Sequence, residues 1–231
     1  MVNNKDIDKI TNTVEAFFKQ YRLQKYKAGE VVIHMLDEPG GIYYLKQGFV
    51  KMNTIFTNGN ELTVNIFKPG SFFPMTWGLA DTVNNYTFQA ITDIGFHKAP
   101  KKETLTFLKT NPQVLFDLTK RILSGMDGLI TNFTNLTFGS AVSRVAYALL
   151  LCVKRFGKEK NGTIELDIRL THQDLANLAG LTRETTSVVM SQFKKDLIIS
   201  QPNGKIVIVD FDKLRSQTET DGQSVSSVDT F

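Results

Sequence analysis

One stretch, Leu170 to Asp196, constrains the fold of this chain more than any other, because it contains two short helical patterns on either side of a glycine. Thr171 and Thr182 stand where the two helices would begin, and a hydroxyl there can accept orphan backbone N–H groups. The side chains expected to face inward are Leu175, Leu178 and Ala179 of the first helix and Val188, Val189 and Phe193 of the second. A helix, a tight turn at Gly180 and a second helix with a polar first turn is the helix-turn-helix pattern.

The length and charge of the chain limit the number of domains and the kinds of partner that it can have. At 231 residues the chain is long enough for one large or two ordinary domains, each with its own core. The longest apolar run, 145–153, is too short to cross a bilayer, and the N-terminus lacks the apolar segment of a signal peptide. We therefore expect a cytoplasmic protein without a membrane partner. The net charge of +4 is compatible with nucleic acid as a partner but does not require it.

Metal and cofactor chemistry finds no support in the sequence. The single cysteine, Cys152, excludes an internal disulfide and a protein-held iron–sulfur cluster, which needs about four thiolates. Cys152 lies in the apolar run LLLCV, where thiols are usually inert, and a redox role stays an alternative. His34, His97 and His172 are scattered, so they suggest neither a haem ligand nor a metal cluster. We expect no cofactor, no metal and no catalytic residues.

The N-terminal half changes from a helical to a strand pattern. Residues 5–25 have the apolar spacing of an amphipathic helix. Short segments rich in β-branched and aromatic residues follow, and Asn58-Gly59 is a strong hairpin signal between two of them. The expected strands cover 31–33, 41–45, 49–56, 62–67, 87–91 and 95–98. Many short strands at about ten-residue spacing predict a small antiparallel barrel or roll.

A long helix is expected after the strands. Residues 101–110 suggest a short helix, and Pro112 suits the first turn of the next one. Apolar side chains then recur at a mean spacing near that of a coiled-coil seam, about 3.5 residues. They are Leu115, Leu118, Ile122, Met126, Leu129, Phe133 and Leu136. This pattern predicts a homodimer seam, and Gly125 and Gly128 within it would allow close approach of a partner. An ordinary amphipathic helix packed on the roll is the alternative.

The C-terminal third has the pattern of a second domain. Residues 138–140 are the expected hinge, 141–156 a helix and 163–168 a strand, and the helix-turn-helix follows. Behind it come a strand, a turn and a strand over 197–209, which predict a wing. The expected division is a roll over 1–110, a dimerisation helix over 111–137, a winged helix-turn-helix over 138–212 and a disordered tail over 213–231.

This order of elements resembles the Crp/Fnr family of bacterial transcription regulators. The similarity lies in LTHQDLANLAGLTRETTSVVMSQFKKDLII and in the roll segment NELTVNIFKPGSFF, and it extends from about Tyr26 to Phe211. The resemblance implies an α+β fold, with a jelly-roll-like cyclic-nucleotide-binding-like domain, a long dimerisation helix and a winged helix-turn-helix. It also implies a sequence-specific regulator that binds a palindromic operator in double-stranded DNA as a homodimer and contacts RNA polymerase.

The resemblance assigns roles in DNA binding to matching residues. Arg183 and Glu184 occupy the family's base-reading positions, where an Arg fork can pair with guanine and a Glu can accept from cytosine N4. Ser187 and Val188 stand where the family's next reading residue is often Arg, so the outer part of the target sequence does not follow from the resemblance. The expected phosphate contacts are Thr171, Gln173, Thr182, Lys194 and Lys205. An exposed Arg183-Glu184 pair without a ligand is the alternative.

The sensor region departs from the cyclic-AMP-binding members of the family. No Arg lies between Lys68 and Lys98, so a cyclic phosphate would lack a guanidinium partner, and cyclic AMP is not expected. The segment is instead aromatic, and its residues are Phe72, Phe73, Trp77, Tyr86 and Phe88. They either pack as core or form a pocket for a small organic effector beside the dimer helix. A third alternative is a regulator with no ligand, controlled by its expression level.

Two other classes of function are considered. A roll of this kind can be a cupin-like enzyme, but the histidine and carboxylate cluster that such an enzyme needs is missing from the sequence, so we do not expect an enzyme. The chain could instead be a cyclic-nucleotide-binding-like interaction module without DNA activity. The intact winged motif with Arg183-Glu184 argues against that alternative.

Overall fold

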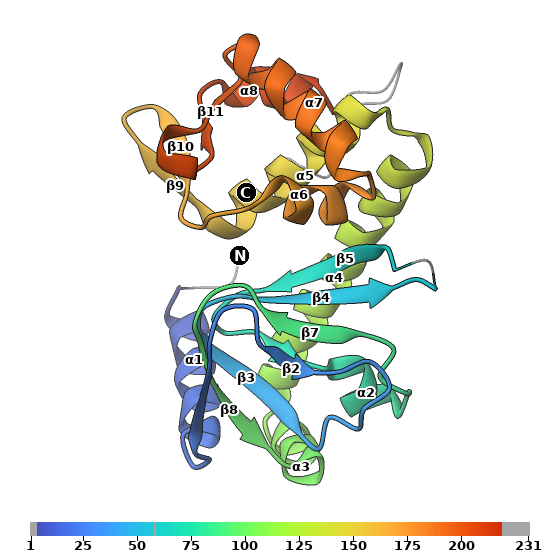
Figure 1. The fold of residues 1–231 in the computed structure, drawn as a ribbon. Helices are drawn as coiled ribbons and strands as arrows, with labels where there is room; N and C mark the ends of the chain where they lie inside the picture. Colours follow the sequence, from blue (N-terminus) through green and yellow to red (C-terminus); the bar gives the residue numbers. More distant parts are fainter. Residues whose placement is uncertain (1–3, 58, 219–231) are drawn as a thin grey trace. The chain divides into compact units, whose positions relative to one another are not determined.

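The computed structural model describes residues 4–57 and 59–218. The chain forms two compact units, of which the first comprises Met1–Ile55 with Thr63–Ser124 and the second Phe56–Leu62 with Gly125–Phe231. The division between them falls inside helix α4 (Pro112–Phe138), not at one of its ends. Each unit is described by itself (Figure 1).

The first unit contains a roll of two four-stranded sheets. One sheet has the order β1 (Leu23–Tyr26), β8 (Ile94–Ala99), β3 (Ile42–Gln47) and β6 (Phe72–Phe73). The other has the order β2 (Val31–Ile33), β7 (Thr87–Ala90), β4 (Val50–Ile55) and β5 (Glu61–Phe67). The pairs β1–β8, β3–β8, β3–β6, β2–β7 and β4–β7 are all antiparallel. This confirms the predicted antiparallel roll.

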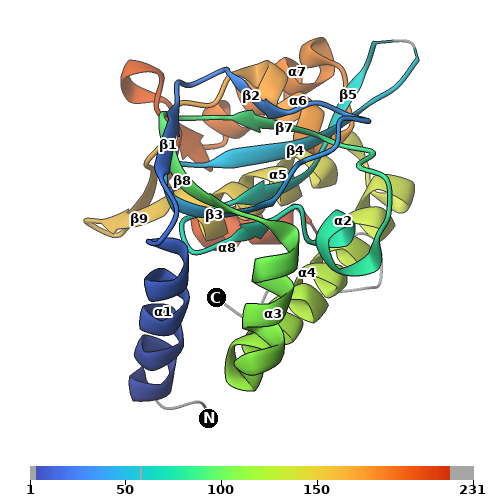
Figure 2. The same ribbon diagram turned by 90° about the horizontal axis from the view of Figure 1, so that it is seen from below.

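Strand alternation divides the core of this unit in two. Neighbouring side chains of a strand point to opposite faces of the sheet, so Tyr43 and Phe73 join one buried cluster while Tyr44 and Phe72 join another. The Tyr43 cluster draws on the strands of both sheets. The Tyr44 cluster also takes in helix α1 (Asn4–Phe18), helix α3 (Lys101–Thr110) and the first turns of α4. These three helices lie together on one side of the roll (Figure 2).

Three segments of the first unit differ from the prediction. The first helix ends at Phe18, not near residue 25, because residues 23–26 pair with β8 as the edge strand β1. Strand β6 and the short helix α2 (Met75–Ala80) lie in the aromatic segment after the Pro69-Gly70 turn, where no element was predicted. Pairing with β3 creates β6, and this long-range contact leaves no local sequence pattern.

The described part of the second unit contains the C-terminal half of α4, further α-helices and one small sheet. The further helices are α5 (Ala141–Phe156), α6 (His172–Ala179), α7 (Arg183–Lys195) and α8 (Phe211–Ser216). Its sheet has the order β11 (Ile199–Ser200), β12 (Val207–Ile208), β10 (Thr163–Leu166) and β9 (Gly157–Lys160), and the short helix η1 (Pro202–Gly204) connects β11 to β12. Helix α5 contacts α6, α7 and α8 and supplies much of the core.

The predicted disordered tail is wrong over its first residues. Asp210 caps α8 by accepting a hydrogen bond from the Lys213 N–H, and Leu214 is fully buried. Packing of Leu214 in the core of the second unit stabilises α8. The helix was hard to predict because its other residues are mostly polar. Residues 219–231 of the predicted tail lie outside the described part of the chain.

Candidate DNA interface

Helix α6 begins with a capping box that uses both functions of the Thr171 hydroxyl. Thr171 Oγ1 accepts from the Asp174 N–H at 3.1 Å and donates to the Asp174 carboxylate at 2.7 Å. The Thr171 N–H donates to the same carboxylate at 2.9 Å. These bonds fix the first turn of α6. A phosphate contact from the Thr171 hydroxyl would have to compete with them.

The turn between α6 and α7 is held by an arginine of another helix. Gly180 ends α6 with φ +58°, and an added Cβ would lie 2.9 Å from an Arg144 nitrogen, so the position favours glycine. Arg144 of α5 donates from Nε to Ala179 O at 3.0 Å and from Nη2 to Gly180 O at 2.7 Å. Burial lowers the pKa of this guanidinium. Arg144 thus positions the two helices, and nothing in its local sequence indicates this.

Helix α7 presents its polar first turn to solvent. Thr182 caps the helix by accepting from the Thr185 N–H at 3.2 Å. Arg183 and Glu184 are exposed, and within residues 4–57 and 59–218 neither forms an ion pair. Their charged ends are therefore available to a partner. Both share the exposed start of the helix.

The packing of α7 corrects one predicted inward residue. Val189 and Phe193 are buried as expected, but Val188 is 71% exposed. Thr186 and Met190 are buried instead, and together with Val189 and Phe193 they form the inward face of α7. Val188 therefore belongs to the outward face, as its predicted role beside the bases requires.

Ser187 is turned toward α6. Its Oγ donates to Arg183 O at 2.8 Å and lies 2.8 Å from His172 Nδ1. Burial, followed by the charges of Lys194 and Arg183, lowers the pKa of His172. The predicted base contact of Ser187 would have to compete with these hydrogen bonds. His172 thus lies beside the predicted reading helix, a position that its own sequence neighbours do not indicate.

The predicted phosphate contacts differ in how free their polar atoms are. Gln173 is exposed and donates to Asn177 Oδ1 at 2.7 Å, and Lys194 is half-buried in the last turn of α7. Lys205 forms an ion pair with Glu165 at 2.7 Å, which raises the pKa of Lys205 and partly neutralises its charge. Arg169, which the sequence analysis did not single out, is exposed just before α6.

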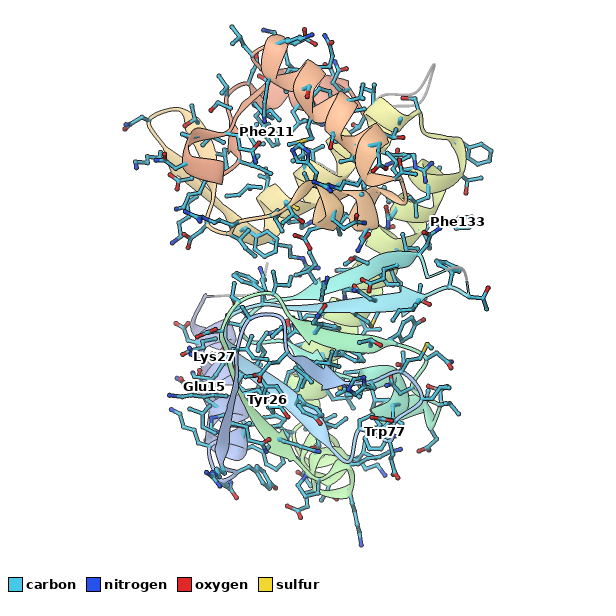
Figure 3. All side chains as sticks on the ribbon, in the orientation of Figure 1. Glu15, Tyr26, Lys27, Trp77, Phe133 and Phe211 are labelled. Atoms are coloured by element: carbon cyan, nitrogen blue, oxygen red, sulfur yellow. The ribbon has the colours of Figure 1, made fainter. Side chains whose placement is uncertain are left out.

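The five aromatic residues of the sensor segment do not share one pocket. Phe73 and Phe88 are buried and stack with ring centroids 5.3 Å apart, and Tyr86 packs against their cluster. Phe72 belongs to the other cluster, as does Trp77, which lies on α2 with the Lys101 ammonium 4.5 Å from its ring centre (Figure 3). Phe73 also stacks on Tyr43 and Phe67, so aromatic rings of the chain itself fill the interior of the roll.

The predicted seam of α4 contains side chains with two different surroundings. Leu118 is only 4% exposed and packs in the roll, as does Leu115. Ile122, Met126, Leu129 and Phe133 are exposed. Phe116, Leu123 and Ile130, which were not predicted, are more exposed than Ile122, Met126 and Leu129 and follow one another at seven-residue intervals.

Together with Met126 and Phe133, these residues define an outward stripe: Phe116, Leu123, Met126, Ile130 and Phe133. Two of them, Met126 and Phe133, belonged to the predicted seam. The stripe continues through the short side chains of Thr119 and Thr137 at spacings of 3 and 4 residues. Phe133 lies at the outer edge of α4 (Figure 3).

Cys152 is fully buried, and burial raises the pKa of its thiol to about 12, so the thiol stays protonated near neutral pH. Residues 4–57 and 59–218 contain no group of three or more His, Cys, Asp or Glu side chains placed to hold a metal ion. Among the helices of the same residues, none is both long and apolar enough to cross a membrane.

Comparisons with known proteins agree with this architecture. Residues 23–111 match the family described as Cyclic nucleotide-binding domain, and residues 143–217 match the Crp-like helix-turn-helix domain. The transcriptional regulator SdrP of Thermus thermophilus is 28% identical over 86% of this chain and 95% of its own length. The global nitrogen regulator of a Nostoc species is 26% identical over 80% of this chain and 84% of its own length.

Solved structures give the same result. A CRP/FNR-family transcriptional regulator from Thermus thermophilus superposes with a TM-score of 0.72 at 26% identity, over 87% of this chain and all of the other. The chain is thus a transcription regulator with a DNA-binding helix-turn-helix and a cyclic-nucleotide-binding-like domain. It belongs to the Crp/Fnr family.

Proposed function

We propose that the protein regulates transcription as a homodimer that places two copies of α7 in successive major grooves of a palindromic operator. The observation that carries this proposal is the exposed Arg183-Glu184 turn at the capped start of α7, which forms no ion pair with residues 4–57 and 59–218. Thr182 caps that turn, and Arg144 holds the preceding corner through Ala179 O and Gly180 O. A preorganised reading turn loses little conformational freedom when it meets DNA.

Base reading is assigned to the outward face of α7. Arg183 can donate two hydrogen bonds to O6 and N7 of one guanine, and Glu184 can accept from N4 of a cytosine. Val188, one turn further along, can contact a thymine methyl group. Ser187 contributes less than the sequence suggested, because its hydroxyl is engaged by His172 and Arg183 O.

Phosphate contacts are assigned around this face. Gln173 is well placed because its amide keeps a second hydrogen after bonding to Asn177. Lys194 adds charge at the end of α7. Thr171, Thr182 and Lys205 remain candidates, although each would share its polar atoms with an existing cap or ion pair.

The homodimer is proposed to form along the outward stripe of α4. Apolar residues that alternate at three and four residues are the pattern of a two-stranded coiled coil. Two parallel copies of the helix would bury Leu123 and Ile130 against their counterparts. Leu115 and Leu118 are excluded from this seam, since they pack within the roll of their own chain.

Control by cyclic AMP does not fit the roll. A relative from Haemophilus influenzae is a cAMP-activated regulator, but this chain has no Arg between Lys68 and Lys98 to meet a cyclic phosphate. The stacked rings of Phe67, Phe73 and Phe88 also occupy the interior. These features favour regulation without a ligand inside the roll. A small effector would need another position beside α4, and contact with RNA polymerase is proposed from the family alone.

Selection of duplexes from a random-sequence pool tests the proposal directly. The full chain at fixed salt should enrich a two-fold-symmetric sequence with a G·C pair in each half-site. Multi-angle light scattering of the same protein should give the mass of a dimer. Failure to enrich any sequence would contradict the regulator proposal, and a monomer mass would contradict the stripe.

A further inference from the structure

The hydrogen bonds of Ser187 determine which nitrogen of His172 carries a hydrogen. Ser187 Oγ lies 2.8 Å from Arg183 O and 2.8 Å from His172 Nδ1. A hydroxyl has one hydrogen, and a carbonyl oxygen only accepts, so the Ser187 hydrogen goes to Arg183 O. The hydrogen between Ser187 and His172 therefore comes from Nδ1.

This arrangement leaves the other nitrogen of the neutral ring without a hydrogen. A neutral imidazole has one donor and one acceptor nitrogen, and here the donor is Nδ1. Nε2 then has only a lone pair, which repels a phosphate oxygen. His172 can donate from Nε2 only after the ring has taken up a proton.

The charges around His172 favour an anion. Lys194 and Arg183 of α7 are the charged groups that act on the ring from the neighbouring helix, and both are cations. Asp174, on the same helix as His172, directs its carboxylate to Thr171. Burial and the two cations lower the pKa of His172, so the ring of the free protein is neutral near neutral pH. A phosphate oxygen at this position would compensate the charges of Lys194 and Arg183, and that of the ring once it is protonated.

We propose that His172 is a proton-linked phosphate contact, which takes up one proton when DNA binds and donates from Nε2 to the DNA backbone. Nδ1 keeps its hydrogen bond to Ser187, and Ser187 keeps its bond to Arg183 O. His172 thus also positions the turn that carries the base-reading Arg183. The proton comes from solvent, one for each protomer. This inference rests on the proposed function of α7 as the reading helix.

The sign of the pH dependence follows from the two states. The pKa of His172 is low in the free protein and higher beside a phosphate, so DNA binding is favoured as the pH falls through the interval between the two values. Each unit by which the phosphate raises the pKa strengthens binding by up to about tenfold for each half-site.

The test measures the dissociation constant of the full chain for a duplex selected by the wild-type protein. Fluorescence anisotropy at constant salt would cover about pH 5.5 to pH 8, the interval in which histidine titrates. The wild-type protein should bind more tightly as the pH falls. His172→Asn keeps an amide donor toward Ser187 but does not titrate, so it should retain binding at the upper end and lose the pH dependence. His34→Gln, an exposed histidine of the first unit, is the matched control and should keep the full dependence.

A second variant addresses the tautomer. Ser187→Ala removes the acceptor for Nδ1–H, so the neutral ring can move its hydrogen to Nε2 and meet a phosphate without a proton. Its pH dependence should be shallower than that of the wild type. Nitrogen-15 spectra of the free protein should show Nδ1–H in the wild type.

The outcomes separate this inference from the proposed function. A protein that enriches no duplex at any pH contradicts the regulator proposal, whereas the free-protein spectra still decide the tautomer. A wild type that binds its duplex without pH dependence, or a His172→Asn variant with the wild-type dependence, overturns the role of His172. An Nε2–H tautomer in the free protein overturns it as well.

Discussion

Arg183 carries the sequence selectivity of the proposed complex, because its guanidinium is exposed while its backbone is held by the cap of α7 and by Ser187. Arg183→Ala should cost about 1–3 kcal/mol for each half-site on the selected duplex and much less on a random duplex. Anisotropy titrations on both duplexes measure the difference. Lys195→Ala, which removes an exposed charge of the same helix, should weaken both complexes alike. Equal losses for Arg183→Ala on the two duplexes would contradict its reading role.

Leu197 occupies a backbone conformation that suits glycine. Its φ is +56° at the end of α7, and its side chain is 69% exposed, so packing does not compensate the strain. Leu197→Gly should raise the free energy of unfolding by about 0.5–1 kcal/mol, which a urea titration would detect. Ser191→Gly, at an ordinary helical position of α7, should lower it. A destabilised Leu197→Gly protein would show that the side chain has a packing role.

Residue roles were predictable only where they depend on local sequence. Thr171 and Thr182 were recognised as caps because a cap acts within its own turn. Arg144 and His172 were missed because they act on residues 35 and 15 positions away. Such contacts exist only once the helices have packed, and no spacing rule describes them.

At the scale of the element, helix α4 shows why a periodic pattern of apolar residues does not determine which side of a helix stays exposed. The roll covers only Leu115 and Leu118 of the predicted seam, whereas Ile122, Met126, Leu129 and Phe133 are exposed. Leu115 and Leu118 pack in the roll, so the free stripe lies one residue further on, at Phe116, Leu123 and Ile130. The helix was predictable from its period, whereas its orientation required the fold.

The seam proposed along the outward stripe makes a prediction about the dimer. Ile130→Glu would place two carboxylates against each other across the proposed seam, and it should weaken dimerisation at least tenfold, by about 1.4 kcal/mol or more. Sedimentation velocity over a concentration series measures this. Ser124→Glu adds the same charge to an exposed position of α4 outside the stripe and should leave the dimer intact. Dimers of equal strength in both variants would place the seam elsewhere.

At the scale of the whole molecule, the order of elements was predictable from the spacing of apolar residues. The period of that spacing changes from 3.6 residues in the helical segments to 2 in the strands and back again. The filled interior of the roll was not predictable in the same way. Aromatic residues such as Phe73 and Phe88 can line a pocket or fill a core, and the sequence does not distinguish the two. Their stacking in the structure shows that they pack on each other. The site of any effector therefore follows from geometry, not from composition.

Two-fold binding gives the final prediction, which concerns the complete dimer on DNA. In the proposed complex each α7 reads only a few base pairs, so the affinity for a palindrome would depend on both copies binding at once. Two half-sites about 34 Å apart face the same side of the duplex, and inserting about five base pairs between them turns one to the opposite side. Binding should then fall to the level of a duplex with a single half-site, as a gel-shift titration at fixed salt would show. Ile130→Glu, which should weaken dimerisation, should show a smaller difference in affinity between the original and the extended palindrome than the wild type. A wild-type protein that tolerates the insertion without loss would bind as independent monomers, and the α4 stripe would then need another partner.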